Sequence, residues 1–109
     1  MGYGHPRNDQ RSIWLHRAIA YKLLAEPNAV LAKARQHTAW MHQDPHTRAY
    51  AHRWDALLAL PVDELARRLT ENTEEMIALR QCTPFAGVLS PQERWDIYRA
   101  FRHSWEVHR

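Results

Sequence analysis

Residues 83–95 read TPFAGVLSPQERW, and this stretch contains the clearest helix start in the chain. Ser90, Pro91 and Glu93 occupy the N-cap, N1 and N3 positions of a capping box. In a capping box, the serine hydroxyl and the glutamate carboxylate each accept a hydrogen bond from a backbone amide that would otherwise have no partner. The sequence therefore predicts a helix that begins here and occupies the C-terminal part of the chain.

The five residues before this helix start form a continuous apolar run in a segment that Pro84 and Gly87 mark as a loop. Two interpretations of the run stay open. In the first, Phe85, Val88 and Leu89 fill the core, and Gly87 adopts a positive φ. In the second, the loop joins the aromatic residues of the following helix in an exposed patch that binds a protein partner.

Helical start signals and apolar spacings of three or four residues recur along the rest of the chain. No window shows the alternation of apolar and polar residues that is typical of strands. The predicted helices run from Asn8 or Asp9 to about Ala25, from Pro27 to about His42, from Asp44 to about Leu60, from Pro61 onward, and from Asn72 to about Gln81. We therefore expect an all-α fold, a compact bundle of about six short helices. Residues 1–8 are expected to form a flexible N-terminus and residues 9–109 a single helical domain.

Cysteine content and hydropathy indicate the compartment. The chain has 109 residues and one cysteine, Cys82, which excludes an intramolecular disulfide and a cysteine-based zinc cluster. This composition suits a reducing compartment. The N-terminal residues lack the apolar stretch of a signal peptide, and no window approaches the ~20 apolar residues that span a bilayer. We expect a cytoplasmic protein that does not act at a membrane.

Charge is distributed unevenly along the chain. Residues 1–53 contain eight Lys/Arg and three Asp/Glu, whereas residues 54–82 contain three Lys/Arg and six Asp/Glu. A basic half of this kind can attract an anionic partner. Its candidate nucleic-acid contacts are Arg11, Arg17, Lys33 and Arg35. Their spacing spreads them around the predicted helices, and no helix-turn-helix pair is apparent, so a nucleic-acid-binding regulator is kept as the alternative function.

Residue types that often carry catalysis or bind metals lack the spacing that such sites need. Among the eight histidines, His42 and His46 are four apart, but Pro45 breaks the helix between them. We expect solvated surface histidines, no metal site and no cofactor. Cys82 lies at the predicted C-terminus of a helix, which disfavours a thiolate. Because no triad or dyad can be assembled from nearby residues, we expect a protein that is not an enzyme.

The predicted C-terminal helix carries an aromatic stripe in which Trp95, Tyr98 and Trp105 recur at helical spacing. Tryptophan, tyrosine and arginine dominate the binding hot spots of protein interfaces. Combined with the second interpretation of the apolar loop, the stripe predicts a partner-binding surface of Phe85, Leu89, Trp95, Tyr98, Arg99 and Arg102.

Two segments carry a resemblance to a known group of proteins, LRQCTPFAGVLSPQERWDIYRAFR at residues 79–102 and IWLHRAIAYKLLAEPNAVLAKA at residues 13–34. Together they resemble short all-helical bacterial proteins encoded in operons of the toxin–antitoxin type. The resemblance implies an antitoxin-like inhibitor that neutralises a partner protein, such as a cognate toxin, by direct contact and without catalysis. An inhibitor of a host defence protein, carried by a phage or mobile element, fits the same sequence. Unlike typical antitoxins, the chain has no obvious DNA-binding module and no long disordered tail, which puts operator binding in doubt.

Overall fold

The computed structural model describes residues 7–108. Within this range the chain forms six α-helices, one short 3₁₀ turn and no strand, which confirms the predicted all-α bundle. The elements are α1 (Arg7–Ala25), α2 (Pro27–Gln43), α3 (Arg48–Leu58), α4 (Val62–Arg68), α5 (Glu74–Arg80), η1 (Ala86–Val88) and α6 (Pro91–His108). Residues 1–6 of the predicted flexible N-terminus lie outside the described range, whereas Arg7 and Asn8 belong to α1. None of the described helices is long and apolar enough to cross a membrane.

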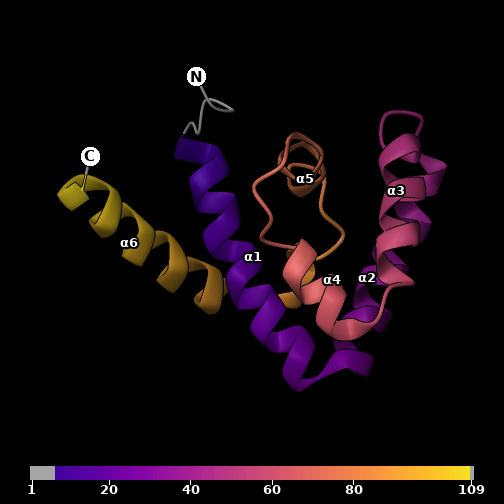
Figure 1. Cartoon of the computed structure of the whole chain (residues 1–109), viewed down its shortest axis with the longest axis horizontal. Coiled ribbons are helices and arrows are strands. Elements are labelled where there is room, and N and C mark those ends of the chain that lie inside the picture. The colour runs from indigo at the N-terminus through magenta and orange to yellow at the C-terminus, as the bar shows by residue number, and fades with distance from the viewer. Residues whose placement is uncertain (1–6, 109) are drawn as a thin grey trace.

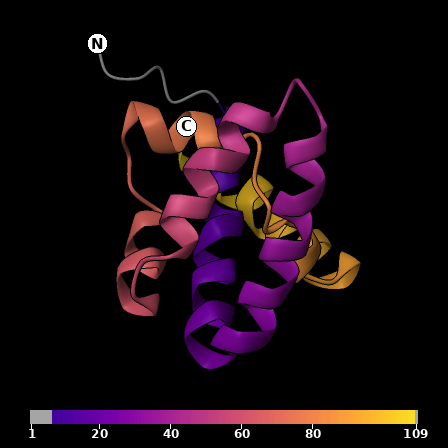
Figure 2. The same cartoon turned by 90° about the vertical axis from the view of Figure 1, so that its right-hand side faces the viewer.

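Helix α1 runs through the middle of the molecule, with α6 on one side and α2 to α5 on the other (Figure 1). Figure 2 looks at the bundle from the side of α2 and α3, with α1 behind them. One face of α1 is buried, and its residues recur every three or four positions as Asp9, Ile13, His16, Ile19 and Leu23. This spacing keeps them on a single helical face, so α1 forms one wall of the core.

The two largest core side chains are Trp54 of α3 and Phe85 of the apolar loop. Their ring centroids are 5.6 Å apart and the ring planes make an angle of 74°, the edge-to-face arrangement that aromatic quadrupoles favour. The indole Nε1 of Trp54 donates a hydrogen bond to the Cys82 carbonyl oxygen at 2.9 Å. The polar atom of the buried ring is therefore paired, as burial requires.

The apolar loop is part of this core, which confirms the first interpretation of the run. Pro84 and Phe85 are fully buried, and Val88 and Leu89 are nearly so. The predicted positive φ of Gly87 is wrong, because Gly87 lies in the 3₁₀ turn η1 and does not adopt a left-handed conformation. The turn folds the apolar side chains inward without needing glycine.

The capping box at the start of α6 is confirmed. The Glu93 amide donates to Ser90 Oγ at 3.1 Å, and the Ser90 amide donates to Glu93 Oε1 at 2.8 Å. The predicted start of α3 is wrong by a few residues. The Asp44 carboxylate accepts the His46 amide at 2.9 Å in a tight turn, so it is not free to cap a helix, and α3 begins only at Arg48.

Two further predicted caps are wrong, and at α5 the reason is that adjacent short polar side chains compete for the same role. Thr73 caps α5 in place of Asn72, since its hydroxyl accepts the Met76 amide at 3.1 Å. Asn8 and Asp9 lie inside α1 and do not cap it. Asp9 is buried and its carboxylate accepts a 3.3 Å hydrogen bond from the Gln81 side chain, so it joins α1 to the segment after α5.

Candidate functional site

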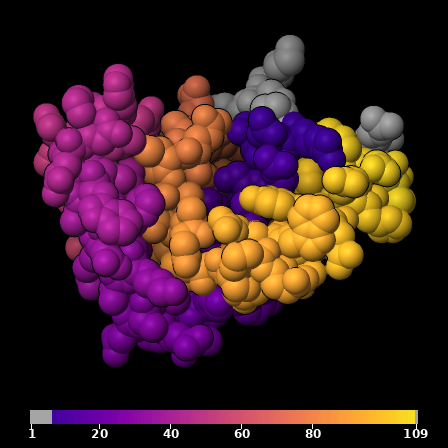
Figure 3. Space-filling model, turned by 180° about the vertical axis from the view of Figure 1, so that it is seen from behind, coloured from indigo at the N-terminus to yellow at the C-terminus, as the bar shows by residue number. Residues whose placement is uncertain are grey.

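Helix α6 packs on the outer side of α1, and among its apolar residues only the half-buried Ile97 packs against the main core cluster. Phe101 is the one buried residue among the 18 that form α6. Helix α1 meets α6 with Arg7, Arg11 and Trp14, whose spacing of four and three places them opposite the core-facing residues of α1. In the view from behind, α6 lies across the surface beside the first turns of α1 (Figure 3). Most of α6 therefore remains open to solvent.

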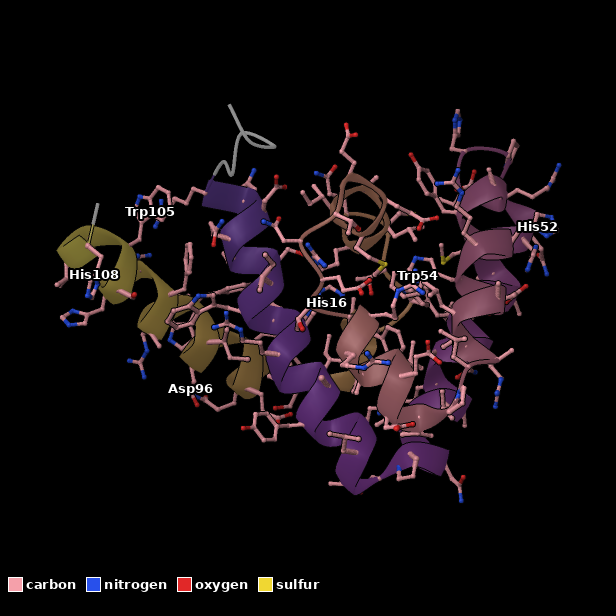
Figure 4. The ribbon with its side chains drawn as sticks, in the orientation of Figure 1. His16, His52, Trp54, Asp96, Trp105 and His108 are labelled. Atoms are coloured by element: carbon pink, nitrogen blue, oxygen red, sulfur yellow. The ribbon has the colours of Figure 1, made fainter. Side chains whose placement is uncertain are left out.

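The seam between α1 and α6 is made of aromatic rings and arginines. Trp14 meets Phe101 edge-on, with ring centroids 5.5 Å apart, and Trp105 lies 5.8 Å beyond Phe101. Figure 4 shows Trp105 close to the N-terminal end of α1. The guanidinium carbon of Arg11 lies 4.9 Å from the Tyr98 ring centroid, and that of Arg7 lies 5.9 Å from the Phe101 centroid. These cation–π contacts hold both guanidinium groups against α6.

The structure brings four of the six predicted partner-binding residues together on the exposed side of α6. Trp95 is 53% exposed, Tyr98 is half-buried, and Arg99 and Arg102 are exposed. Helical spacings of three and four residues make them neighbours on one side of the helix. We call Trp95, Tyr98, Arg99 and Arg102, together with Arg11 above Tyr98, the α6 face.

The other two predicted partner-binding residues are wrong. Phe85 has no exposed surface and Leu89 is only 5% exposed, because both fill the core beneath the loop. Phe85 packs edge-on against Trp54 and cannot reach a partner without leaving that contact. The apolar loop therefore supports the position of α6 from inside and does not extend the α6 face.

The surface formed by α1 and α6 has more arginines than its carboxylates can pair. Arg99 lies 3.4 Å from Asp96, and Lys22 lies 2.8 Å from Glu93. Among the described residues, no carboxylate lies within ion-pair distance of the other surface arginines of these two helices, namely Arg7, Arg11, Arg17, Arg94 and Arg102. The outer side of the α1–α6 pair is consequently cationic.

Lys22 of α1 fixes the end of the apolar loop to the start of α6. Its Nζ donates to the Val88 carbonyl oxygen at 3.1 Å and to Glu93 Oε1 at 2.8 Å. The hydrogen bond from Lys22, with a further one from the Ser90 amide, lowers the pKa of Glu93 from 4.5 to about 2. Glu93 thus stays ionised and serves both the capping box and the contact with α1.

His16 of α1 fixes the beginning of the same loop, and the prediction that all eight histidines lie on the surface is wrong for this residue. His16 is 1% exposed, and its Nδ1 donates to the Ser12 carbonyl oxygen at 2.8 Å. The neutral ring then accepts from the Thr83 hydroxyl through Nε2 at 3.0 Å, while Thr83 Oγ1 accepts the Phe85 amide at 3.1 Å. The position of His16 between Ile13 and Ile19 was the sequence signal for burial.

Arg80 extends the buried polar contacts of α1 and α5, and sequence reasoning also missed it. Its Nη1 donates to the carbonyl oxygens of Leu69 at 3.2 Å and Glu71 at 2.8 Å, so it ties α5 to the end of α4. Desolvation lowers the pKa of Arg80, and the negative charges of Asp9 and Glu71 oppose that shift. These contacts are structural and lie on the core side of α1, away from the α6 face.

The remaining histidines and the cysteine assemble no reactive site on the described chain. His42 contacts the Asp55 carboxylate, and its ring lies 4.7 Å from that of His52. Between residues 7 and 108, no group of three or more His, Cys, Asp or Glu side chains is arranged to hold a metal ion. Partial burial raises the pKa of the Cys82 thiol, which makes it a poor nucleophile at neutral pH.

The four candidate nucleic-acid contacts lie in separate places. Arg11 is stacked on Tyr98, and Arg17 lines a groove between α1 and α6. Lys33 borders a small groove with Lys22, whereas Arg35 lies beside α3 and donates to the Leu58 carbonyl oxygen at 3.4 Å. They do not form a single surface that would follow a phosphate backbone.

A second exposed aromatic residue, Tyr21 of α1, lies on the other flank of the α1–α6 seam. Tyr21 is 79% exposed and separates two shallow apolar grooves, one shared with Ile97 and Ala100 of α6 and the other with Ala66 of α4. It has no part in the α6 face, which makes it a natural control for substitutions there.

Comparison with known proteins adds no identity. No protein-family model, curated protein or solved structure matches this chain.

Proposed function

We propose that this protein is a non-catalytic inhibitor that binds a partner protein through the α6 face and neutralises it by direct contact. The observation that supports this proposal is the placement of α6. This helix has 18 residues and one buried side chain, and its contact with the core cluster of the described chain is made by the half-buried Ile97. A helix that contributes so little to the core, yet presents tryptophan, tyrosine and arginine, has the composition of a binding hot spot.

The resemblance of residues 79–102 and 13–34 to antitoxin-like proteins supports a more specific form of the proposal. In that form the partner is a cognate toxin encoded in the same operon, and both proteins act in the cytoplasm. An inhibitor of phage or mobile-element origin would use the same face against a host defence protein. In either case inhibition follows from covering the partner's surface.

Capture of the partner tests this proposal. The tagged full-length protein is incubated with lysate of its source organism, with and without nuclease, and retained proteins are identified by mass spectrometry. We expect a stoichiometric protein that survives nuclease treatment. Trp95→Ala should weaken its binding by at least about tenfold, the loss typical of a hot spot, because Trp95 is the most exposed aromatic side chain of the face.

Tyr21→Ala provides the matched control, since it also removes an exposed aromatic ring from α1–α6 but outside the α6 face. Retention should be unchanged in this variant. Equal retention by wild-type protein and Trp95→Ala would overturn the proposal. Loss of all bound material after nuclease would instead support the nucleic-acid-binding alternative.

A further inference from the structure

Two arginines of the α6 face, Arg11 and Arg102, lack a carboxylate partner among the described residues, and Arg11 is held against an aromatic ring. Arg11 lies over Tyr98, and Tyr98 is four residues from Arg102, about one helical turn. Arg102 is therefore a neighbour of Tyr98 on α6, while the Arg11 guanidinium covers the Tyr98 ring from α1. Neither arginine forms an ion pair with any described residue. Of the acidic residues on α1 and α6, Asp9 is buried, Glu93 and Asp96 are paired, and only Glu106 remains exposed without a partner in the described range.

A stacked guanidinium is a preorganised receptor for a carboxylate. The ring limits the rotamers of the arginine, so less conformational entropy is lost when its N–H groups bind a planar anion in bidentate fashion. A phosphate would satisfy the same N–H groups, but nucleic-acid grooves also need free aromatic faces on which bases stack. Here Arg11 occupies one face of Tyr98, and Phe101 is buried between Arg7, Trp14 and Trp105. These rings are already used inside the protein.

We propose that the α6 face binds an acidic segment of the partner protein, in which Asp or Glu side chains reach Arg11 and Arg102 and an apolar side chain covers Trp95. This inference rests on the proposed function and names the chemistry of the partner surface. Opposite charge across the interface would speed association and select partners by charge. The exposed Arg99, already paired with Asp96, lies at the edge of this receptor.

Binding of defined probes tests the inference without the natural partner. A synthetic amphipathic peptide with glutamates on one face and leucines on the other is titrated into the ¹⁵N-labelled full-length protein. The matched probes are the same peptide with glutamine in place of glutamate and a single-stranded oligonucleotide of equal charge. We expect the acidic peptide to shift the Trp95 indole resonance and the Nε–H resonances of Arg11 and Arg102, and to bind more tightly than either other probe.

Arg102→Gln should weaken binding of the acidic peptide by about threefold to tenfold at low salt, because a charge-assisted contact at an exposed site is lost. Lys33→Gln is the charge-matched control, since Lys33 is exposed on α2 and far from the α6 face in sequence and contacts. No shift with the acidic peptide, or binding that the glutamine peptide or the oligonucleotide equals, would overturn the inference. Such a failure, together with Trp95-dependent capture of a protein from lysate, would leave the proposed function standing and refute only the acidic partner.

Discussion

His16 of α1 and Thr83 at the start of the apolar loop share a 3.0 Å hydrogen bond although 67 residues separate them in sequence. At the other end of the loop, Lys22 of α1 donates to the Val88 carbonyl oxygen. Two polar side chains of one helix thus hold both ends of a segment whose apolar side chains enter the core. Because α6 begins directly after this segment, the two contacts also set where α6 crosses α1.

The buried His16 predicts a specific loss of stability in mild acid. Burial is the main cause that lowers the pKa of His16 from 6.5 to about 4. The hydrogen bond to the Ser12 carbonyl oxygen opposes this decrease, and the positive charge of Arg80 adds to it. The folded state then resists protonation, so its stability is intact above pH 6.5 and decreases as the pH falls from 6.5 toward 4. We expect His16 to account for a decrease of up to about 3 kcal/mol in the free energy of unfolding over that window.

Urea denaturation at a series of pH values measures this effect. Replacing His16 by glutamine removes the titrating group, so the dependence on pH between 6.5 and 4 should become shallower. His46→Gln, which changes an exposed histidine, should leave the slope unchanged. Identical slopes for wild type and His16→Gln would show that His16 does not titrate on unfolding.

Removing the Thr83 hydroxyl should destabilise the fold, because this one group takes part in two hydrogen bonds. Thr83→Val keeps the shape of the side chain but leaves the Phe85 amide and His16 Nε2 without their hydrogen-bond partner. We expect a loss of about 1–3 kcal/mol in unfolding free energy. Thr70→Val, at a hydroxyl with only a long, exposed contact, is the control and should change stability little. A Thr83→Val variant as stable as wild type would contradict the role given to this hydrogen bond.

Gly87→Ala should stabilise the protein. Gly87 lacks a left-handed φ, and a Cβ built on it meets no atom within 4 Å. Alanine therefore fits the native turn while it restricts the unfolded chain, which is expected to add about 0.4–1 kcal/mol to the unfolding free energy. Thermal and urea denaturation check the value. A lower melting temperature would show that the turn requires glycine after all.

Local signals in the sequence were sufficient to predict the helices. They also sufficed to predict the capping box of α6, because Ser90 and Glu93 interact within a single turn. They were insufficient where several capping residues are adjacent. At Thr73 and around Asp44, the choice between neighbouring polar side chains depends on the path of the chain into the bundle. Helix existence was thus predictable, and the end of each helix less so.

The candidate site was predicted only in part, because some of its features depend on contacts between segments that are distant in sequence. The prediction that Trp95, Tyr98 and Arg102 share one side of α6 needed only helical spacing, which is a local property of the sequence. Burial of Phe85 and Leu89 depends on contacts with helices distant in sequence, such as the Trp54 ring. Likewise, both faces of α1 carry apolar or aromatic residues, so its sequence does not reveal which face meets the core and which meets α6. The stacking of Arg11 on Tyr98 follows from that choice.

Hydrogen–deuterium exchange of the protein, alone and with its captured partner, tests the central claim most directly. If the partner binds the α6 face, backbone amides of residues 95–105 and of the first turns of α1 should exchange more slowly in the complex, because contact excludes water and suppresses local opening. Residues 27–58, which form α2 and α3, should exchange as in the free protein. Protection confined to α2 and α3, with α6 unchanged, would contradict the account.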